Sequence, residues 1–488
     1  MKQKILFFLF IVMSHLICQN PPDTLWTKTF GGDHNDAATC VRQTSDGGFF
    51  VIGSTDPLGN DMNDFWLIKT DEMGNLIWEA AFGGDQDDCP YIGQQTMDGG
   101  YVVVGYTESF GNGLRDFWLV KTDAEGNEEW NQTYGTQLHD RAQFLEQTSD
   151  GGYILTGGTG YFEGSGQDIW LIKTDAVGTV EWEQTFGGEG IEKAYTVHQE
   201  TNGSYILTGY TTSFGNGNLD VWLIKTDEFG NEIWSRTFGG TEIDNAYSLQ
   251  ICPDGGYILA GITRSFGQGQ DDVWLIKTDS LGIEEWNKVY GTEDTDFCYS
   301  VSLTNDGSYI LGCSTNSTAN SDFDVLAMKI DEFGNELWTV KIGESSDDFS
   351  FYIEQTNDEG FVLAGRSNSF GNGDDDIYLI KLEPDEVDSE NILDQPSGFK
   401  LWNYPNPFNP STTINFETSS FHEFPQIEIY NLKGQMVKTF SSFQISQSLN
   451  QHIVWNGTNQ SNNPVSSGIY YYKLNIPNSP INKMLLIK

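Results

Sequence analysis

Residues 89–134, CPYIGQQTMDGGYVVVGYTESFGNGLRDFWLVKTDAEGNEEWNQTY, contain the pattern that decides the fold. Four segments rich in β-branched and aromatic residues are separated by Gly, Asn and Asp, so the stretch predicts four short β-strands. Tight turns at 97–100 and 124–127 join the first two and the last two strands, because glycine accepts the positive φ of such turns. No part of the stretch has the periodicity of an amphipathic helix. The predicted strands are residues 89–96, 101–107, 116–123 and 128–134.

The same pattern recurs every 52 residues along most of the chain. Glycines from Gly31 to Gly343 and aspartates from Asp64 to Asp376 keep this spacing, and no copy carries an insertion. Four short strands at this period are typical of a β-propeller blade. The sequence therefore predicts an all-β fold with a seven-bladed β-propeller at residues 24–383; the alternative, a β-solenoid, usually has shorter coils without paired tight hairpins. The tryptophans that mark the seven copies are Trp26, Trp78, Trp130, Trp182, Trp234, Trp286 and Trp338.

The order of strands within the repeat predicts how the ring closes. The chain begins with a Trp strand, residues 25–30, and the repeats end with a third strand, residues 377–382. We therefore expect residues 25–30 to pair with the last repeat and complete the seventh blade. The GG-x-x-x-D links and the S-F-G-N-G-x-x-D loops then lie on one face and the tight turns on the other. A ligand site is expected on the long-loop face or in the mouth of the central channel, because long loops carry function more often than minimal turns do.

The repeat resembles a known family. TFGGDHNDAATCVRQTSDGGFFVIGST (29–55) followed by DFWLIKTDEMGNLIW (64–78) resembles the SBBP family of bacterial β-propeller repeats. The shared elements are GG-x-x-x-D, the D-G-G-Y/F turn, the G-x-T strand end and D-x-W-L-I-K-x-D-x-x-G. The segment WLIKTDEMGNLIW is also similar to the tryptophan docking motif of quinoprotein-type propellers. The resemblance covers about residues 24–383 and implies the fold, but no single activity.

A second domain is expected after an acidic linker at residues 384–397. Residues 398–488 contain several alternating strands, which predict a small Ig-like β-sandwich. In their order, the motifs resemble the C-terminal sorting domain of cargo for the bacterial type IX secretion system. The resemblance implies the type IX secretion machinery as a partner, passage across the outer membrane, and release or attachment at the cell surface. The motifs are NYPNPFNPSTTINF (403–416), IEIYNLKGQMV (427–437), VWNG (454–457) and SSGIYYYKL (466–474).

The N-terminus and the charge also predict an exported protein. Lys2 and Lys4 precede a short apolar segment, so residues 1–18 are expected to be a cleaved signal peptide, with lipidation at Cys18 as the alternative. The net charge is −45, and residues 397–488 hold three acids against six lysines (+3), which leaves −48 on the first 396 residues. Such acidity repels nucleic acid and anionic membranes. No later stretch is apolar and long enough for a membrane-spanning helix, so the expected location is secreted or at the outer cell surface.

No metal site or cofactor is predicted. The five cysteines after the leader share no repeat position, although Cys298 and Cys313 flank a hairpin turn almost symmetrically and a disulfide between them is an open alternative. The periodic acids suggest calcium, but Asp36 and Asp64 begin strands two apart in one sheet, roughly 10 Å from each other. One cation cannot bridge that gap. Capping of turns and strand ends is therefore the expected role of these acids.

Aromatic residues in the repeat are expected to be structural. Perfect periodicity indicates that the tryptophans pack blade against blade, while stacking on sugars is the alternative. Phenylalanines in the loop before the third strand are expected to anchor that loop on the neighbouring blade, with an aromatic rim as the alternative. These residues are Phe110, Phe162, Phe214, Phe266 and Phe370.

One register of the predicted inner strand holds mostly polar residues that differ from copy to copy. These side chains are expected to edge the central channel and are the candidate ligand-binding residues; ordinary hydration of the channel is the alternative. Their mixed charge argues against a ring of metal ligands. The candidates are Arg42, Gln94, Glu146, His198, Gln250, Ser302 and Glu354.

The sequence contains no catalytic candidate. It has no nucleophile elbow, metal-binding His pair or Gly-rich phosphate loop, and propeller enzymes usually break the repeat where the chemistry is housed. We therefore expect a non-enzymatic binding, adhesion or scaffold module whose ligand is an unknown protein or glycan. The alternative is a secreted glycan-binding or glycan-degrading protein that uses the long-loop face.

Overall fold

The computed structural model describes residues 21–56, 62–160, 166–316 and 322–385, and then 400–486 without 405, 407, 418–425, 432–434, 441–449 and 475–481. The chain divides into two compact units, residues 1–386 and 387–488. The predicted signal peptide, Phe162 and residues 386–397 of the predicted linker lie outside the described residues. Among the described residues, no helix has the length and apolar content to cross a membrane.

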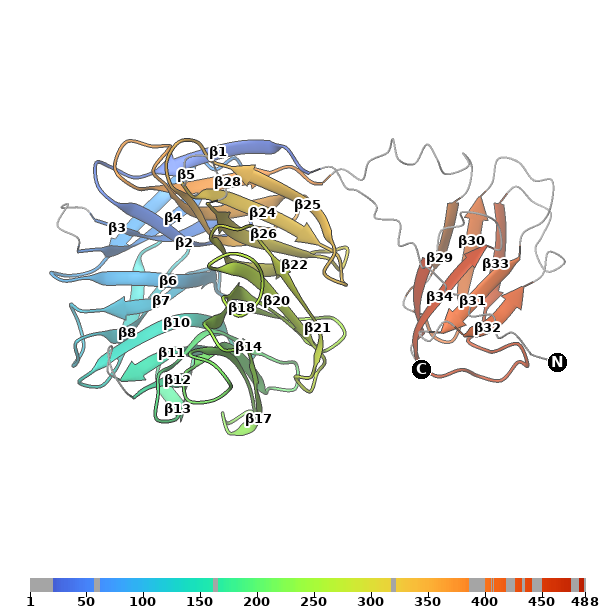
Figure 1. Ribbon diagram of the computed structural model, residues 1–488. Coiled ribbons are helices and arrows are strands. Elements are labelled where there is room, and N and C mark those ends of the chain that lie inside the picture. The colour runs from blue at the N-terminus through green and yellow to red at the C-terminus, as the bar shows by residue number, and fades with distance from the viewer. Residues whose placement is uncertain are drawn as a thin grey trace. The chain divides into compact units, whose positions relative to one another are not determined.

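The first unit consists of seven four-stranded antiparallel sheets (Figure 1). We call them blades 1 to 7. In blade 2 the strands begin and end within one residue of the predicted bounds. The strands are β1 Thr24–Phe30, β2 Asp36–Gln43, β3 Phe49–Thr55, β4 Asp64–Thr70, β5 Leu76–Phe82, β6 Asp88–Gln95, β7 Tyr101–Thr107, β8 Asp116–Thr122, β9 Glu128–Tyr134, β10 His139–Gln147, β11 Tyr153–Gly160, β12 Gln167–Thr174, β13 Val180–Phe186, β14 Glu192–Gln199, β15 Tyr205–Thr211, β16 Asp220–Thr226, β17 Glu232–Phe238, β18 Asp244–Ile251, β19 Tyr257–Thr263, β20 Asp272–Thr278, β21 Glu284–Tyr290, β22 Asp296–Leu303, β23 Tyr309–Thr315, β24 Asp324–Ile330, β25 Glu336–Ile342, β26 Asp348–Gln355, β27 Phe361–Ser367 and β28 Asp376–Leu382.

The two ends of the propeller sequence meet in one sheet. Strand β1 pairs antiparallel with β28, and the order in blade 7 is β1-β28-β27-β26. Each blade contacts the next, and the inner strand β2 of blade 1 contacts β27 of blade 7. The sheets therefore form a closed ring, and the predicted pairing of residues 25–30 with the last repeat is confirmed.

Tryptophans of the outer strands join neighbouring blades. Trp78 of blade 1 lies edge-on to Tyr101 of blade 2, with ring centroids 5.5 Å apart. The β8–β9 turn of blade 2 also lies against Trp78, because Gly126 has φ +83° and a Cβ there would lie 2.7 Å from the indole ring. Any larger residue at Gly126 would meet both a strained backbone and an occupied space. The contacts agree with the predicted blade-to-blade packing.

A buried lysine on the third strand of every blade is paired with carboxylates. In blade 3, Lys173 Nζ lies 2.9 Å from Asp150 of the tight turn and 2.9 Å from Glu181 of the outer strand, and it donates to the Thr174 carbonyl. Its side chain is 3% exposed, so the ion pairs compensate for the loss of hydration. These lysines are Lys69, Lys121, Lys173, Lys225, Lys277, Lys329 and Lys381.

Blade 4 achieves the same pairing with different residues. The turn aspartate of the other blades is Asn202 here, and Glu200 stands where blade 3 has Thr148. Glu200 forms the ion pair with Lys225 and accepts a 2.6 Å hydrogen bond from Tyr257. Burial acts to raise the pKa of Glu200, but these two donors outweigh it, so the pKa lies below its usual value.

The periodic acids cap backbone N–H groups, as predicted. The Gly32 N–H donates to Asp36 Oδ2 at 2.9 Å. Asn112 and Gly113 donate to Asp116 Oδ2 at 2.6 and 3.1 Å. Acids of adjacent blades also lie together, which the prediction within one sheet did not include: Asp36 and Asp376 both lie against Gly31. Within the described part of the chain, no group of three or more His, Cys, Asp or Glu side chains is placed to hold a metal ion.

These acids predict a stability maximum at mildly acidic pH. Burial, helped by the Asp140 carboxylate, raises the pKa of Asp116 above 3.8, so protonation of Asp116 stabilises the fold and stability falls as the pH rises through its pKa. Burial acts to raise the pKa of Asp150 and Asp306, but their hydroxyl and lysine partners outweigh it and lower the pKa to about 2. These two ionised carboxylates therefore stabilise the fold above pH 3.8, and this stabilisation is lost as the pH falls toward 2.

We therefore expect the melting temperature to rise as the pH is lowered from 7 toward 3.8, where the acids with a raised pKa take up protons, and to fall between 3.8 and about 2. Differential scanning calorimetry of the full chain over this range measures both limbs. The Asp116→Asn variant should show a smaller rise, because one charge of the pair no longer titrates. A melting temperature that falls steadily from pH 7 downward would contradict the prediction.

The cysteines and loop phenylalanines have defined places. Cys298 and Cys313 are buried and directly opposite each other in β22 and β23, with free thiols, and the disulfide stays a prediction.

Phe110 packs on Trp118 of its own blade, with centroids 5.2 Å apart, and Phe370 packs on Tyr378 at 5.1 Å. The ring tips of Phe110, Phe214 and Phe266 also lie against Gly84, Gly188 and Gly240, in the links that follow the preceding blade. The loop therefore packs both on its own blade and on the link from its neighbour, in part as predicted.

The second unit contains two antiparallel sheets that share one apolar core. One sheet has the order β29-β30-β33 and the other β32-β31-β34-β35. The fully buried Trp455 lies in the core with Phe408, Ile414 and Tyr472. The strands are β29 Lys400–Tyr404, β30 Thr412–Glu417, β31 Ile427–Asn431, β32 Met436–Phe440, β33 Asn450–Trp455, β34 Gly468–Leu474 and β35 Asn482–Leu486.

Candidate binding site in the central channel

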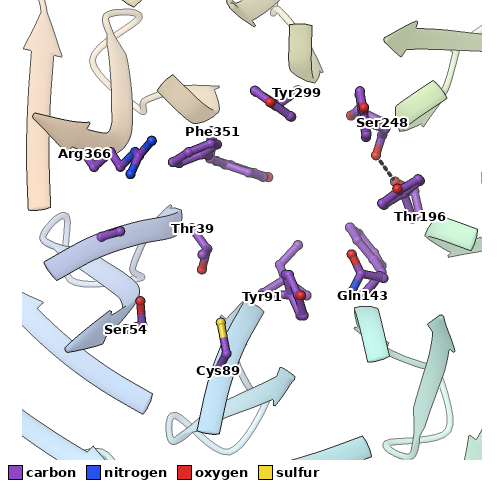
Figure 2. Close-up of a pocket in the computed structure, with 17 residues that line it drawn as sticks. Thr39, Ser54, Cys89, Tyr91, Gln143, Thr196, Ser248, Tyr299, Phe351 and Arg366 are labelled. Atoms are coloured by element: carbon purple, nitrogen blue, oxygen red, sulfur yellow. Dashed lines mark hydrogen bonds between the residues drawn. The ribbon is translucent and has the colours of Figure 1, made fainter. Parts of the chain in front are cut away.

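A cavity of about 460 Å³ lies where the innermost strands of the blades converge. Figure 2 shows side chains from different blades pointing into this common space, among them Tyr91, Gln143, Tyr299 and Arg366. The volume lies in the range of about 300–1,000 Å³ that is usual for small-molecule sites. The lining residues are Ala37, Thr39, Ser54, Cys89, Tyr91, Ile92, Gln143, Phe144, Tyr195, Thr196, Tyr247, Ser248, Tyr299, Ser300, Phe351, Tyr352 and Arg366.

A β-bulge in each innermost strand builds this lining. In β6 the pairing register jumps between Pro90 and Ile92, which leaves Tyr91 without a cross-strand partner. A bulge directs two successive residues to one side of the strand, so both Tyr91 and Ile92 line the cavity. The same jump occurs at the equivalent place in all seven blades. The bulged residues are Thr39, Tyr91, Gln143, Tyr195, Tyr247, Tyr299 and Phe351.

Four of the bulged residues form a continuous wall, the aromatic arc, which consists of Tyr195, Tyr247, Tyr299 and Phe351. Successive ring centroids along the arc are 4.9, 5.1 and 5.2 Å apart. Burial raises the pKa of Tyr247 and Tyr299, so both hydroxyls are neutral donors at physiological pH. The bulged residues of blades 1 to 3 add Thr39, Tyr91 and Gln143, and the wall thus combines one aromatic side with one more polar side.

Two cations stand at the two ends of the aromatic arc. Lys193 precedes Tyr195 by two residues in β14, and its Nζ lies 4.9 Å from the centroid of that ring. Arg366 of β27 lines the cavity, stacks over Phe349 at 4.8 Å and pairs with Asp375 at 2.5 Å. Burial lowers the pKa of Lys193 to about 8.

The candidate residues from the sequence analysis lie one layer further along the channel and do not line the cavity. Arg42 pairs with Glu354 at 3.2 Å and stacks over Tyr352 at 4.6 Å. His198 bonds Glu146 at 2.5 Å and the Leu249 carbonyl at 2.9 Å. These contacts join adjacent blades, while a ligand role for these residues stays a prediction.

The other candidates in this layer also sit at blade boundaries. Gln94 accepts a hydrogen bond from the Gln147 N–H at 3.3 Å, and Ser302 donates to the Ile353 carbonyl at 2.8 Å. Gln250 is half-buried in β18. Burial raises the pKa of Glu354, and Arg42 acts against that shift. The layer below the cavity is therefore mainly a set of inter-blade links.

The bulged residues were not predicted to line the cavity, because the 52-residue repeat shows which residues are equivalent but not which of them have a cross-strand partner. A signal for them does exist in the sequence. The bulge position changes between Thr, Tyr, Gln and Phe, while the residue directly before it stays small, as Ala38, Ala142 and Ala246 show. Variation at one fixed position of an otherwise regular inner strand indicates a side chain that faces neither packed sheet.

The lining of the cavity limits its chemistry. The lining residues include one charged side chain, Arg366, and contain no Asp, Glu or His. Glycoside hydrolysis commonly requires two carboxyl groups that flank the scissile bond, and acid–base catalysis in general requires a titratable group within reach of the substrate. The described lining of this cavity is therefore mainly aromatic and uncharged polar.

Comparison with known proteins identifies the C-terminal part of the chain. Residues 403–488 match the secretion system C-terminal sorting domain. This match indicates secretion or attachment at the cell surface through the type IX secretion system, and it implies an interaction of this domain with the type IX machinery.

Other relatives are distant. A segment is 26% identical over 163 residues to the regulatory protein FlaEY of Caulobacter vibrioides, and the match spans 29% of this chain and 17% of that protein. Among solved structures, Sqt1 from Chaetomium thermophilum is 12% identical with a TM-score of 0.44, covering 75% of this chain and 99% of Sqt1. An α-L-arabinanase from Penicillium chrysogenum is 14% identical with a TM-score of 0.41, covering 59% of this chain and 91% of the enzyme.

Proposed function

We propose that this protein is an exported, non-enzymatic binding module that holds a small ligand, or one end of a larger one, in the central cavity of its propeller. The observation that carries the proposal is the aromatic arc. Four rings in contact present a continuous apolar surface, and such surfaces in concave sites are typical of ligand recognition. The sorting domain supports a role outside the cell, where such a module can act in adhesion or capture.

Saccharide recognition fits the cavity better than recognition of a flat protein surface. A sugar ring has an apolar C–H face that can lie on the arc, and its hydroxyls can bond Thr39, Gln143 and the tyrosine hydroxyls. A glycan-degrading activity is disfavoured, because the wall of the cavity lacks the two carboxyl groups that hydrolysis needs. We therefore propose that the protein binds a glycan and does not cleave it.

The Tyr247→Ala variant tests the site. Tyr247 contacts both Tyr195 and Tyr299, so its loss should divide the arc and weaken binding by at least about tenfold. A glycan array identifies a ligand for the full chain, and isothermal titration calorimetry then compares the variants.

Phe229→Ala is the matched control, because Phe229 is an exposed aromatic residue on the β16–β17 turn. Tyr247→Phe should retain most of the affinity, since the ring remains. Unchanged affinity of Tyr247→Ala would place the ligand elsewhere, and release of reducing ends from the bound glycan would refute the non-enzymatic role.

A further inference from the structure

Lys193 differs from the buried lysines of the third strands. Each of those ammonium groups has at least one carboxylate partner, for example Asp254 at 2.9 Å from Lys277. Among the residues that the structure describes, the ammonium of Lys193 lies over the face of Tyr195 at 4.9 Å, and no carboxylate or other acceptor there reaches it. The chain has a net charge of −45 and therefore an excess of carboxylates. A lysine that has no carboxylate partner among the described residues is unexpected in such a chain.

The position of this cation is linked to the site. Tyr195, over which the ammonium lies, is the first ring of the aromatic arc and lines the cavity. At the other end of the arc, Arg366 is the one charged residue of the lining, and Asp375 already neutralises it. Among the described residues around the cavity, Lys193 is therefore a positive charge without a carboxylate partner beside the first ring of the arc, and partial desolvation strengthens its attraction for an anion.

We propose that the cavity binds an acidic sugar, a hexuronate residue at the end of a glycan, with its ring on the aromatic arc and its carboxylate on Lys193. The proposal rests on the proposed function and specifies its ligand. One free ammonium balances one carboxylate, whereas a phosphate dianion would need a second free cation. The hydroxyl-rich ring matches the several uncharged donors and acceptors of Thr39, Gln143 and the tyrosines. Burial lowers the pKa of Lys193 to about 8, so most of the ammonium remains protonated at pH 7.

Matched pairs of saccharides test this assignment on the full chain. Calorimetry at low salt compares oligogalacturonate with the neutral galactose oligomer, and glucuronate-ended with glucose-ended oligomers, each of two to three rings. We expect the acidic member of a pair to bind about tenfold more tightly, and this preference to shrink as the salt concentration rises. A third comparison, between benzoate and benzyl alcohol, measures the effect of a carboxylate on a ring that is not a sugar.

The Lys193→Met variant should remove the preference for the acidic member, so that the acidic and neutral saccharides of a pair bind with equal affinity. Lys288→Met, on the outer strand β21, is the matched control and should keep the preference. Lys193→Arg should retain it, because the charge remains. Equal melting temperatures of the variants and the parent chain show that any loss is local.

The outcomes separate this inference from the proposed function. If neutral and acidic saccharides bind equally and Tyr247→Ala abolishes both, the cavity is a binding site and the acidic-sugar assignment is wrong. If benzoate binds more tightly than the uronates, the assignment of a sugar as the ligand is wrong. A preference for acidic sugars that survives Lys193→Met would refute the role of Lys193. Failure of every saccharide on the array to bind would refute the proposed function as well.

Discussion

A chain that lacks Thr24–Phe30 should lose the cooperative unfolding transition of its propeller. In the intact chain, β1 covers the edge of β28, and Trp26 lies 5.8 Å from Phe49 of blade 1. Without β1, blade 7 would have three strands, and its contact with blade 1 would lose this tryptophan. Loss of a whole strand and its packing removes on the order of 5 kcal/mol or more, which is comparable with the total stability of a domain.

Thermal unfolding followed by near-ultraviolet circular dichroism measures the effect. The matched control is a chain that starts at Pro21 and keeps β1, which should unfold like the propeller of the full chain. A synthetic peptide of residues 21–32 added to the shortened chain should restore the transition, because it can occupy the free edge of β28. A shortened chain that melts within a few degrees of the control would show that β1 is not needed for closure.

The Glu200→Thr substitution should strongly destabilise blade 4. Lys225 has a side chain that is 9% exposed, and Glu200 is its carboxylate partner. Removal of one partner of a buried ion pair typically costs about 3–5 kcal/mol, because the other charge stays buried without compensation. The hydroxyl of Tyr257 also loses the acceptor that it now has at 2.6 Å.

The second substitution Asn202→Asp should recover most of this loss. It places a carboxylate at the turn position from which Asp150 reaches Lys173 in blade 3. A double-mutant cycle of urea unfolding free energies measures the coupling between the two positions. Asn202→Asp alone, with Glu200 present, should change stability little. The interpretation is wrong if the double variant is as unstable as Glu200→Thr.

The strands and their closure could be predicted because they depend on local patterns. Runs of β-branched and aromatic residues between Gly, Asn and Asp gave the strands of blade 2 to within one residue. The offset of the repeat, which begins with a Trp strand and ends with a third strand, leaves one arrangement in which every sheet has four strands. That arrangement is the observed pairing of β1 with β28.

The lining of the cavity could not be predicted in the same way. A strand without interruption places Cys40 and Arg42 on one side and Val41 on the other, so the polar register of Arg42 seemed to edge the open channel. The bulge at Thr39 adds a second lining residue at one end of the strand, and the Arg42 layer is closed by links between blades. The contacts of acids across blades, such as Asp36 with Asp376, were missed because distances were considered within one sheet.

The bulge in each inner strand has a consequence for how such a protein can evolve. Its backbone takes no part in the ladder, and its side chain faces the channel instead of the adjoining sheets. Substitutions at the bulged position do not disturb the packing between sheets that keeps the seven copies alike. The cavity is therefore surrounded by seven positions that can vary independently. New selectivity can then arise by substitution at these sites alone, without remodelling of loops and without loss of the architecture that presents them.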